Sequence, residues 1–240
     1  MKKRGFSVIE MLVSLAISLF VFLAALEFFG LTRDLFLKLK SATEETQAAA
    51  AALDKIRIDL LRAGSGLVGP VSQGTVKGII AGGNSLLIYR LEEAYPLGAD
   101  ISPGDRETVL GDAAGLRPGR EVCLAGEDRS ELRVISACAG KTVILSAPLE
   151  FSYPQAEGRL LLLEKTTIFL DEPNGTVRRK VNASSPQPLL DDVVRFECGF
   201  DPESKLARAG FVLAGNQEKK YEVWVLPKNL GLARNHYPAE

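Results

Sequence analysis

The residue with the clearest chemical consequence in this chain is Glu10, a carboxylate near the start of a long apolar run. Residues 2–4 read Lys-Lys-Arg, and residues 11–26 carry no charge. A charged side chain that faces lipid costs about 2.5 kcal/mol or more, so an acid in an apolar segment implies a partner and a function. We therefore take Glu10 as the first candidate functional residue and the apolar run as the element that must position it.

Residues that could carry out catalysis are scarce in the rest of the sequence. The single histidine, His236, lies in a polar tail, which argues against a His-based triad. No cysteines have the CxxC spacing of zinc or redox sites, and no GxxxxGK(S/T) phosphate loop is present. Asp171, Glu172 and Asn174 offer oxygen ligands for calcium, but they lack the EF-hand spacing and fit a tight turn. We expect no enzymatic activity, no cofactor and no metal site.

The three cysteines, Cys123, Cys138 and Cys198, leave two interpretations open. Cys123 and Cys138 are close enough in sequence for a disulfide, which an extracytoplasmic domain would permit. The alternative is that all three are small buried hydrophobic residues. The odd number leaves at least one thiol free or paired with another chain.

Length and charge limit the classes of protein that fit. The 240 residues suffice for one domain with an anchor or for two small domains. The 29 basic and 30 acidic residues nearly cancel, which argues against a broad nucleic-acid-binding surface.

The first apolar segment, residues 6–26, has the length of a membrane span. About twenty residues of helix cover roughly 30 Å, the thickness of one hydrocarbon core. The basic residues before it predict a cytoplasmic N-terminus and an external remainder. A cleavable secretory signal fits less well, because residues 23–25 (Leu-Ala-Ala) make a poor cleavage site. A plain signal anchor is the other alternative, and both leave Glu10 unexplained.

A helical pattern continues beyond the apolar segment. Apolar or small residues recur at spacings of three or four, which predicts one helix over about residues 6–62 with a stripe that packs under a sheet. Gly64 is a natural stop, and Gly30 is a possible bend. The stripe comprises Phe28, Leu31, Leu35, Leu39, Ala42, Thr46, Ala49, Leu53, Ile56 and Leu60.

Short apolar runs separated by turn residues follow the helix and predict strands. We expect residues 100–119 to form a loop and residues 171–175 to form the turn of a hairpin. The fold class is therefore α+β, with one long helix followed by antiparallel sheet. The predicted strands are 85–90, 120–124, 131–136, 142–145, 159–170, 176–179, 193–200 and 220–226.

The N-terminus resembles the class III signal of type IV prepilins and pseudopilins, with Gly5, Phe6 and Glu10 at the motif positions. The resemblance implies that a prepilin peptidase cuts after Gly5 and methylates the new amine of Phe6. It also implies an assembly role for Glu10, which would pair with the Phe6 amine of a neighbouring subunit. A pair between Glu10 and the Phe6 amine of the same chain remains an alternative.

Three later segments resemble PilW-type minor pilins in the same order: residues 53–64, 116–122 and 186–196. Type II secretion pseudopilins of the J class are similar in plan. The resemblance implies a pilin-like fold. Its parts would be a leader at residues 1–5, a transmembrane half-helix at 6–30, an amphipathic half-helix at 31–66 and an extracytoplasmic β-rich domain at 67–240.

The function that this resemblance implies is that of a minor pilin or pseudopilin, which is held in the inner membrane and joins, primes or caps a pilus or pseudopilus. The implied partners are the prepilin peptidase, the major pilin, other minor pilins and the pilus or secretion assembly machinery. The alternative is a bitopic envelope protein whose β-rich domain binds a ligand.

Overall fold

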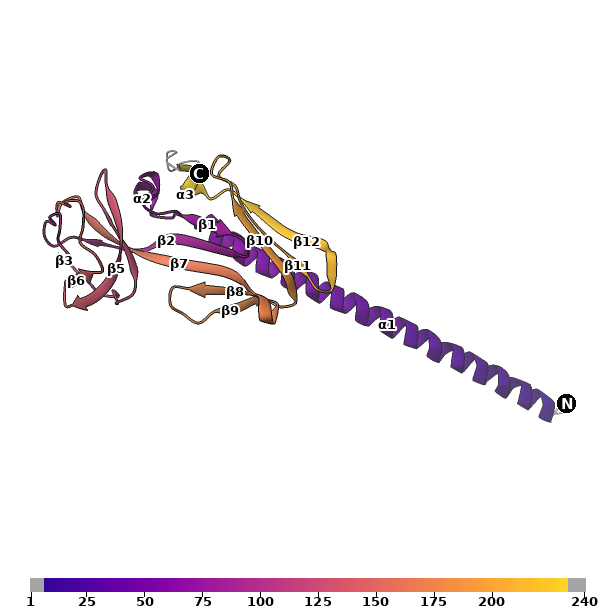
Figure 1. The fold of residues 1–240 in the computed structure, drawn as a ribbon. Coiled ribbons are helices and arrows are strands. Elements are labelled where there is room, and N and C mark those ends of the chain that lie inside the picture. Colours follow the sequence, from indigo (N-terminus) through magenta and orange to yellow (C-terminus); the bar gives the residue numbers. More distant parts are fainter. Residues whose placement is uncertain (1–6, 233–240) are drawn as a thin grey trace, which may run out of the picture. The chain divides into compact units, whose positions relative to one another are not determined.

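The computed structural model describes residues 7–232, so the predictions for Gly5, Phe6 and His236 lie outside the described residues. The fold is α+β, as the sequence predicts: a long N-terminal helix is followed by antiparallel sheets (Figure 1). The helices are α1 (Val8–Leu61), α2 (Val68–Ser72), the 3-10 turn η1 (Glu172–Asn174) and α3 (Lys228–Leu232). The strands are β1 (Ile79–Gly82), β2 (Ser85–Pro96), β3 (Glu107–Val109), β4 (Glu121–Ala125), β5 (Ser130–Ala139), β6 (Thr142–Leu145), β7 (Arg159–Asp171), β8 (Thr176–Val181), β9 (Gln187–Leu190), β10 (Val193–Phe200), β11 (Ala207–Leu213) and β12 (Asn216–Val225).

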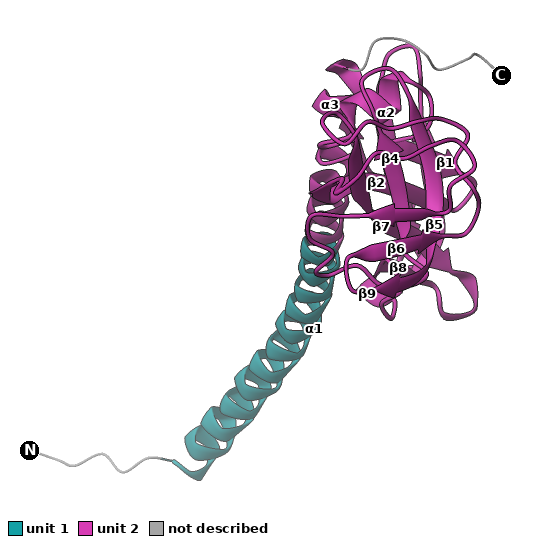
Figure 2. Ribbon diagram, turned by 90° about the vertical axis from the view of Figure 1, so that its left-hand side faces the viewer, with its two compact units in different colours: residues 1–48 teal, residues 49–240 magenta. Residues whose placement is uncertain are grey.

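Helix α1 contributes to both compact units of the chain, which divide between Ala48 and Ala49 (Figure 2). It continues through Gly30 without interruption. Its buried residues begin at Ala49 and continue with Ala52, Ile56, Asp59 and Leu60.

The prediction that the whole stripe packs under the sheet is wrong for its first half. Leu31, Leu35 and Leu39 are exposed, and the buried part of the stripe starts only at Ala49. The side chains of Ala49 and Ala52 are small, so the sheet can approach the helix closely at these positions. Residues 40–47 are mostly polar and present no comparable apolar surface.

The end of α1 is fixed by glycine, as predicted. Gly64 has a φ of +68°, a left-handed conformation that glycine adopts without a steric penalty. Its N–H donates to the carbonyl of Tyr89 in β2 at 2.8 Å. A Cβ at this position would lie 2.5 Å from Leu230 Cδ2. Backbone conformation and packing therefore both require glycine at the turn into the β-rich region.

The larger sheet has nine strands, which run β1-β2-β7-β4-β5-β6-β3, with β8 beside β7 and β9 beside β8. All of these pairings are antiparallel. Strand β7 pairs with β2 along one side. Along the other side it pairs first with β4, at residues 159–162, and then with β8, at residues 166–171. The sheet therefore divides at residues 163–165 of β7.

A second sheet of three strands has the order β10-β11-β12. Its inner face contributes Phe196, Ala209, Phe211 and Val225 to the same hydrophobic core as Ile56 of α1. A separate core lies among β3, β4, β5, β6 and the loops near them, with Tyr153 and Leu124 among its fully buried side chains. The long strands β2 and β7 contribute to both cores: Leu86 and Ile168 lie in the core with Ile56, and Tyr95 and Leu160 lie in the separate core.

The strands that the sequence did not predict have short or weak signals. Residues 100–119 contain β3, whose three residues pair with β6 and are too few to show alternation. Strand β11 contains Ala207, Ala209 and Gly210, residue types with low strand propensity. It is a strand because β10 and β12 pair with it on both sides. Strand β9 contains Pro188, which suits an edge position. Strand β1 was also missed.

Candidate functional site

Glu10 lies in the first turn of α1, where it completes a capping box with Ser7. The backbone N–H of Ser7 donates to Glu10 Oε2 at 2.9 Å, and the N–H of Ile9 donates to Ser7 Oγ at 3.3 Å. This Ser-x-x-Glu arrangement satisfies two donors at the start of the helix. The Ser-x-x-Glu spacing is visible in the sequence, but the predicted partner of Glu10 was the Phe6 amine alone.

The Glu10 side chain is exposed, so this local bond leaves room for a further partner. A carboxylate has about four acceptor positions, and the described contacts of Glu10 use only one oxygen. Phe6 lies outside the described residues. The structure thus places the Glu10 carboxylate at the start of the helix. Its pairing with the Phe6 amine stays a prediction.

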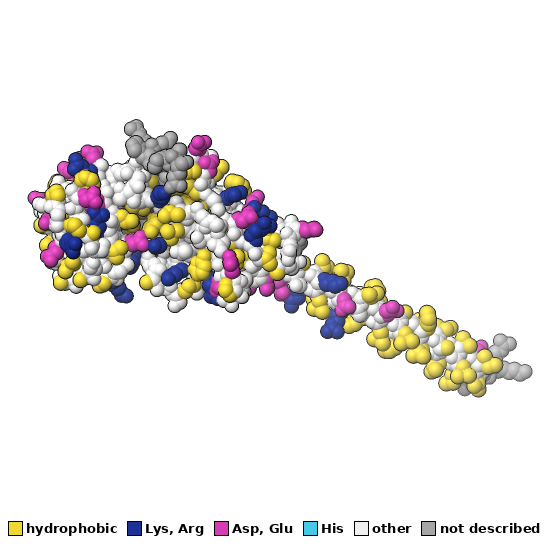
Figure 3. All heavy atoms as spheres, in the orientation of Figure 1, with side chains coloured by type: hydrophobic (Ala, Val, Ile, Leu, Met, Phe, Trp, Pro, Cys, Tyr) yellow, Lys and Arg dark blue, Asp and Glu magenta, His cyan; other side chains and the backbone are white. Residues whose placement is uncertain are grey.

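Large apolar side chains cover the first part of α1. Figure 3 shows them along this part of the helix, and Val8, Met11, Phe20 and Phe28 are each at least 70% exposed. Among the described residues, α1 is the helix that is long and apolar enough to span a membrane, and none of its apolar window is buried. Exposure of this much apolar surface in water is unfavourable, so the segment requires lipid or protein around it.

A cavity of about 300 Å³ lies where the large sheet divides at β7, and Arg120, Leu163, Lys165 and Asn182 are among the residues that line it. Arg120 Nη2 donates to the carbonyl of Leu163 at 3.0 Å. Asn182 donates its N–H to the Lys165 carbonyl at 2.7 Å and accepts the Lys165 N–H on Oδ1 at 2.9 Å. These contacts replace the backbone bonds that a neighbouring strand would supply. We assign these two residues a structural role.

The charges beside this cavity are mostly paired. Glu121 accepts hydrogen bonds from Tyr89 Oη and Lys165 Nζ, each at 2.8 Å. Burial, then the hydrogen bond to Glu121, raises the pKa of Tyr89. The same carboxylate, through its hydrogen bond, raises the pKa of Lys165. Both groups thus keep their protons at neutral pH and donate to Glu121.

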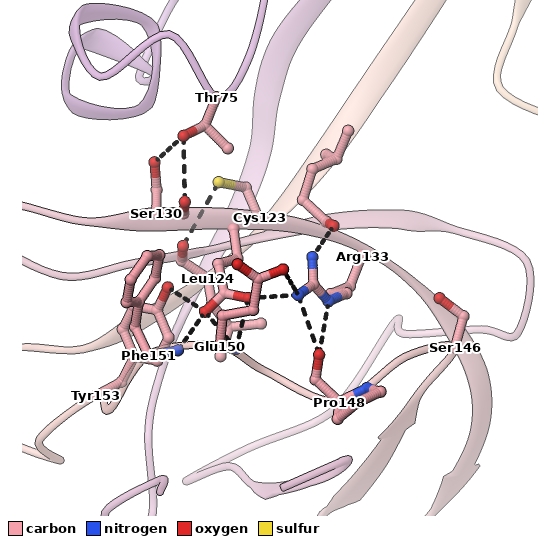
Figure 4. A network of polar contacts seen from close by, with 12 residues as sticks. Thr75, Cys123, Leu124, Ser130, Arg133, Ser146, Pro148, Glu150, Phe151 and Tyr153 are labelled. Atoms are coloured by element: carbon pink, nitrogen blue, oxygen red, sulfur yellow. Dashed lines mark hydrogen bonds and ion pairs between the residues drawn. The ribbon is translucent and has the colours of Figure 1, made fainter. Parts of the chain in front are cut away.

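A second polar network surrounds Glu131 of β5, a residue that is only 5% exposed. Figure 4 shows this network and labels Arg133, Glu150, Phe151 and Tyr153 in it. The Glu131 carboxylate accepts the N–H groups of Glu150 and Phe151, both at 2.9 Å, and the hydroxyl of Tyr153 at 3.1 Å. It also pairs with Arg133. Four donors satisfy the buried charge and fix the loop before β7. This network is therefore a structural anchor that sequence reasoning missed.

The cysteines do not form the disulfide that the sequence permitted. Cys123, Cys138 and Cys198 are free thiols. Cys123 pairs across the sheet with Leu132, six residues before Cys138 on β5, a separation of about 20 Å along a strand. Cys123 also belongs to the hydrophobic core that contains Ile56, whereas Cys138 packs against the separate core among β3, β4, β5 and β6. Burial raises the pKa of Cys123 to about 12, as expected for an unreactive thiol.

The oxygen-rich turn after β7 has local partners for its carboxylates. Asp171 Oδ2 accepts from Asn174 Nδ2 at 2.8 Å and from Arg178 Nε at 2.7 Å, and Glu172 accepts from Asn84 at 2.8 Å. Within residues 7–232, no group of three or more His, Cys, Asp or Glu side chains could hold a metal ion. The residues act as the turn that joins β7 to β8.

Comparison with solved structures finds weak and partial likenesses to three phage proteins. The tailspike of Pseudomonas phage phi297 is 21% identical with a TM-score of 0.28, over 30% of this chain and 14% of that one. The tailspike of Acinetobacter baumannii bacteriophage AP22 is 14% identical with a TM-score of 0.28, over 32% and 15%. The phage phi92 endosialidase is 9% identical with a TM-score of 0.20, over 60% and 32%. This chain spans at most about a third of each, and scores this low support no argument.

Sequence comparison is informative at the N-terminus. No curated protein matches the chain. A profile described as the prokaryotic N-terminal methylation motif matches residues 1–26, which include Gly5, Phe6 and Glu10. The matched segment runs into α1, whose apolar part can span a membrane. The chain therefore carries the N-terminal methylation motif of type IV prepilin-like proteins at the start of a potential membrane helix.

Proposed function

We propose that this chain is a minor pilin or pseudopilin that joins a type IV pilus-like filament and primes or caps it. The observation that carries the proposal is the match of the methylation motif to residues 1–26. The apolar, exposed first part of α1 supports it, because such a surface suits first a membrane and then the apolar core of a filament. An antiparallel β-rich region follows the helix, as this role requires.

In the proposed maturation, a prepilin peptidase cleaves the peptide bond after Gly5 and methylates the amine of Phe6. The inner membrane holds the subunit, with its N-terminus in the cytoplasm and its β-rich region outside. On assembly, the Glu10 carboxylate accepts hydrogen bonds from the Phe6 amine of a neighbouring subunit. This pairing removes two isolated charges from an apolar setting, so one axial register is preferred. The capping box keeps Glu10 at the helix start for this purpose.

The proposed partners are the prepilin peptidase, the major pilin, other minor pilins and the pilus or secretion machinery. We propose an assembly role without enzymatic activity. The PilW type of minor pilin is the subtype that the sequence resembles most, with the J-class pseudopilins as relatives.

The maturation step can be tested by intact-mass spectrometry of the full chain made together with a prepilin peptidase. We expect the mature protein to lack residues 1–5 and to begin with N-methylated Phe6. Gly5→Leu should stay at full length. Gly30→Leu is a matched control on α1, where an added Cβ meets nothing within 4 Å, and it should be processed normally.

The rival function, a bitopic envelope protein with a ligand-binding β-rich domain, predicts a different result. Residues 1–5 would then remain on the protein in the presence of the peptidase. A wild-type chain that keeps these residues, or one cleaved after residue 25, would overturn the proposal of a filament subunit.

A further inference from the structure

The outer face of the three-stranded sheet carries an aromatic and charged row that the proposed function does not use. Register places Gly199 of β10 beside Arg208 of β11, and Arg208 beside Trp224 of β12. Residues paired across a sheet project from the same face. On the same face, Lys220 forms ion pairs with Glu197 and with Glu222. The Trp224 row is therefore the aromatic part of an otherwise charged surface.

Trp224 is unusually open for its residue type. It is the single tryptophan of the chain and is 54% exposed. A tryptophan ring normally contributes a large buried apolar surface, so its exposure gives up stability that the fold could have used. It lies on β12, which within residues 7–232 pairs with β11 alone and is an edge of its sheet. One side of the ring is thus free of any neighbouring strand.

Arg208 is held against this ring. Its guanidinium carbon lies 5.9 Å from the centre of the Trp224 ring, in a cation–π arrangement. On the other side, a Cβ at Gly199 would lie 3.0 Å from Arg208 Nε, so glycine makes room for the arginine. The guanidinium is planar and has five N–H donors. The row therefore combines a flat apolar surface with a group that donates several hydrogen bonds.

A cavity of about 360 Å³ opens at this row, lined by Gly199, Phe200, Asp201, Leu206, Arg208 and Trp224. Its volume is near the lower end of the range of about 300–1,000 Å³ for small-molecule sites. The Asp201 carboxylate on its rim accepts the N–H groups of Glu203 at 3.0 Å and Ser204 at 3.4 Å. The Asp201 N–H donates to the Leu206 carbonyl at 2.9 Å. These bonds fix the loop, and its Asp201 lines the same cavity as the donor Arg208.

We propose that this cavity binds one sugar ring of a saccharide. The face of an aromatic ring is electron-rich, and the C–H groups on one face of a sugar carry a slight positive charge that suits it. The hydroxyl groups at the sugar's edge both donate and accept hydrogen bonds, which matches Asp201 and Arg208 together. A purely apolar ligand would give neither Asp201 nor Arg208 a hydrogen-bond partner. An anion would use Arg208 but would be repelled by Asp201.

Because Trp224 is the single tryptophan, its fluorescence reports on this cavity directly. The test uses the full chain in a detergent without a sugar headgroup, titrated with three neutral saccharides: maltotriose, N,N′,N″-triacetylchitotriose and cellotriose. We expect a saturable change in tryptophan emission with at least one of the three. Calorimetry then measures the affinity of the variants, since Trp224→Ala removes the fluorophore.

Trp224→Ala should weaken saccharide binding by about tenfold or more, and Arg208→Gln should weaken it as well. Glu222→Gln is the matched control, because Glu222 lies on the same strand and the same face but outside the cavity, and it should bind like the wild type. No saturable signal with any of the three saccharides would overturn the proposal, as would unchanged binding by Trp224→Ala. An emission shift with phosphatidylcholine vesicles alone would instead identify a lipid contact. The proposal does not depend on filament assembly.

Discussion

Asp59 is a charged residue in the buried part of α1, and its partner comes from a strand distant in sequence. It is 6% exposed and accepts two hydrogen bonds from Arg179 of β8, at 2.6 Å and 3.0 Å. The burial of Asp59 could not be predicted from the neighbouring sequence, because an Asp near a helix end is often exposed. The pair joins the helix to the β8 side of the large sheet.

We predict that Asp59→Asn lowers the free energy of unfolding by about 3 kcal/mol, because it leaves the guanidinium of Arg179 buried without a carboxylate. Urea unfolding followed by Trp224 fluorescence measures the change. Glu44→Gln is the control: the Lys40–Glu44 pair is 3.9 Å long, with side chains 57% and 66% exposed, so its loss should change stability by about 0.5 kcal/mol or less. A loss below about 1 kcal/mol for Asp59→Asn would contradict the prediction.

Three buried or half-buried tyrosines predict a loss of stability in alkali. Burial is the main cause that raises the pKa values of Tyr89, Tyr95 and Tyr153, and nearby glutamates add to it. In the unfolded chain, tyrosine loses its proton near pH 10. The folded state holds these protons more tightly, so its extra stability is complete below about pH 10 and is lost as pH rises further.

The free energy of unfolding should fall by about 4 kcal/mol per pH unit above pH 10, because the folded state retains three protons that the unfolded chain loses. Urea unfolding at about pH 9, 10 and 11 measures it, and the ultraviolet absorbance of the phenolate reports the titration. Tyr153→Phe should reduce the slope by about a third. Stability that stays constant over this range would show that these hydroxyls titrate normally in the fold.

At the scale of elements, the short buried part of α1 decides which truncated chains can fold. We predict that a chain starting at residue 42 is soluble and monomeric, because it keeps Ala49, Ala52, Ile56 and Leu60. A chain starting at Gly66 should aggregate, since it loses these four buried residues, and each large one contributes about 1.5–3 kcal/mol.

Size-exclusion chromatography and thermal unfolding compare the two truncated chains. A third chain starting at residue 31 is the control, since it keeps the exposed Leu31, Leu35 and Leu39 and should self-associate more than the chain from residue 42. A stable, monomeric chain from Gly66 would show that the helix is not part of the β-rich region's core.

The sequence was sufficient for elements with long or regular patterns. The helix and the strands near Leu86, Val122 and Leu162 were predicted because their apolar residues recur with a clear period. Strand β11 was not, because Ala209 and Gly210 say little about strand formation until two neighbours pair with them. Pairing is a property of the whole sheet, so local sequence cannot show it.

The candidate sites also divide into those with a local sequence signal and those that depend on long-range pairing. Glu10 was found because a charge in an apolar run is a local signal. The cavity at Trp224 depends on the register of three strands, and the network at Glu131 depends on a loop about 20 residues later. The exclusion of the Cys123–Cys138 bridge also needed the register, since sequence distance alone permitted it. Sites built from long-range pairing therefore required the structure.

At the scale of the whole molecule, Glu10 connects the single subunit to the proposed filament. We predict that Glu10→Gln leaves insertion and processing intact but reduces incorporation into filaments by about a hundredfold, since an unpaired buried amine costs about 3 kcal/mol. Glu10→Asp should be intermediate, because its reach is shorter. Quantitative immunoblots of sheared filaments and membranes measure incorporation.

Two controls separate pairing from other effects of Glu10. Glu27→Gln removes an acid from the same helix outside its first turn and should assemble normally. Ser7→Ala weakens the capping box without removing the carboxylate, so its effect should be small. Normal incorporation of Glu10→Gln would show that the acid is merely tolerated in the apolar segment.

The position of β7 at the centre of the large sheet has a consequence for the timing of folding. Strands β2 and β4 do not pair with each other; both pair with β7, which starts at Arg159, 63 residues after Pro96 ends β2. At about 5–20 residues per second, the ribosome needs about 3–13 s to make this interval. Hairpins form in microseconds, so β5 and β6 can pair early while β2 waits with an open edge. Before residue 159 is made, β2 can pair with β1 and β4 with β5, but each keeps one unpaired edge that β7 later covers. A chain that ends before residue 159 therefore exposes two open strand edges, and such edges invite pairing with other chains.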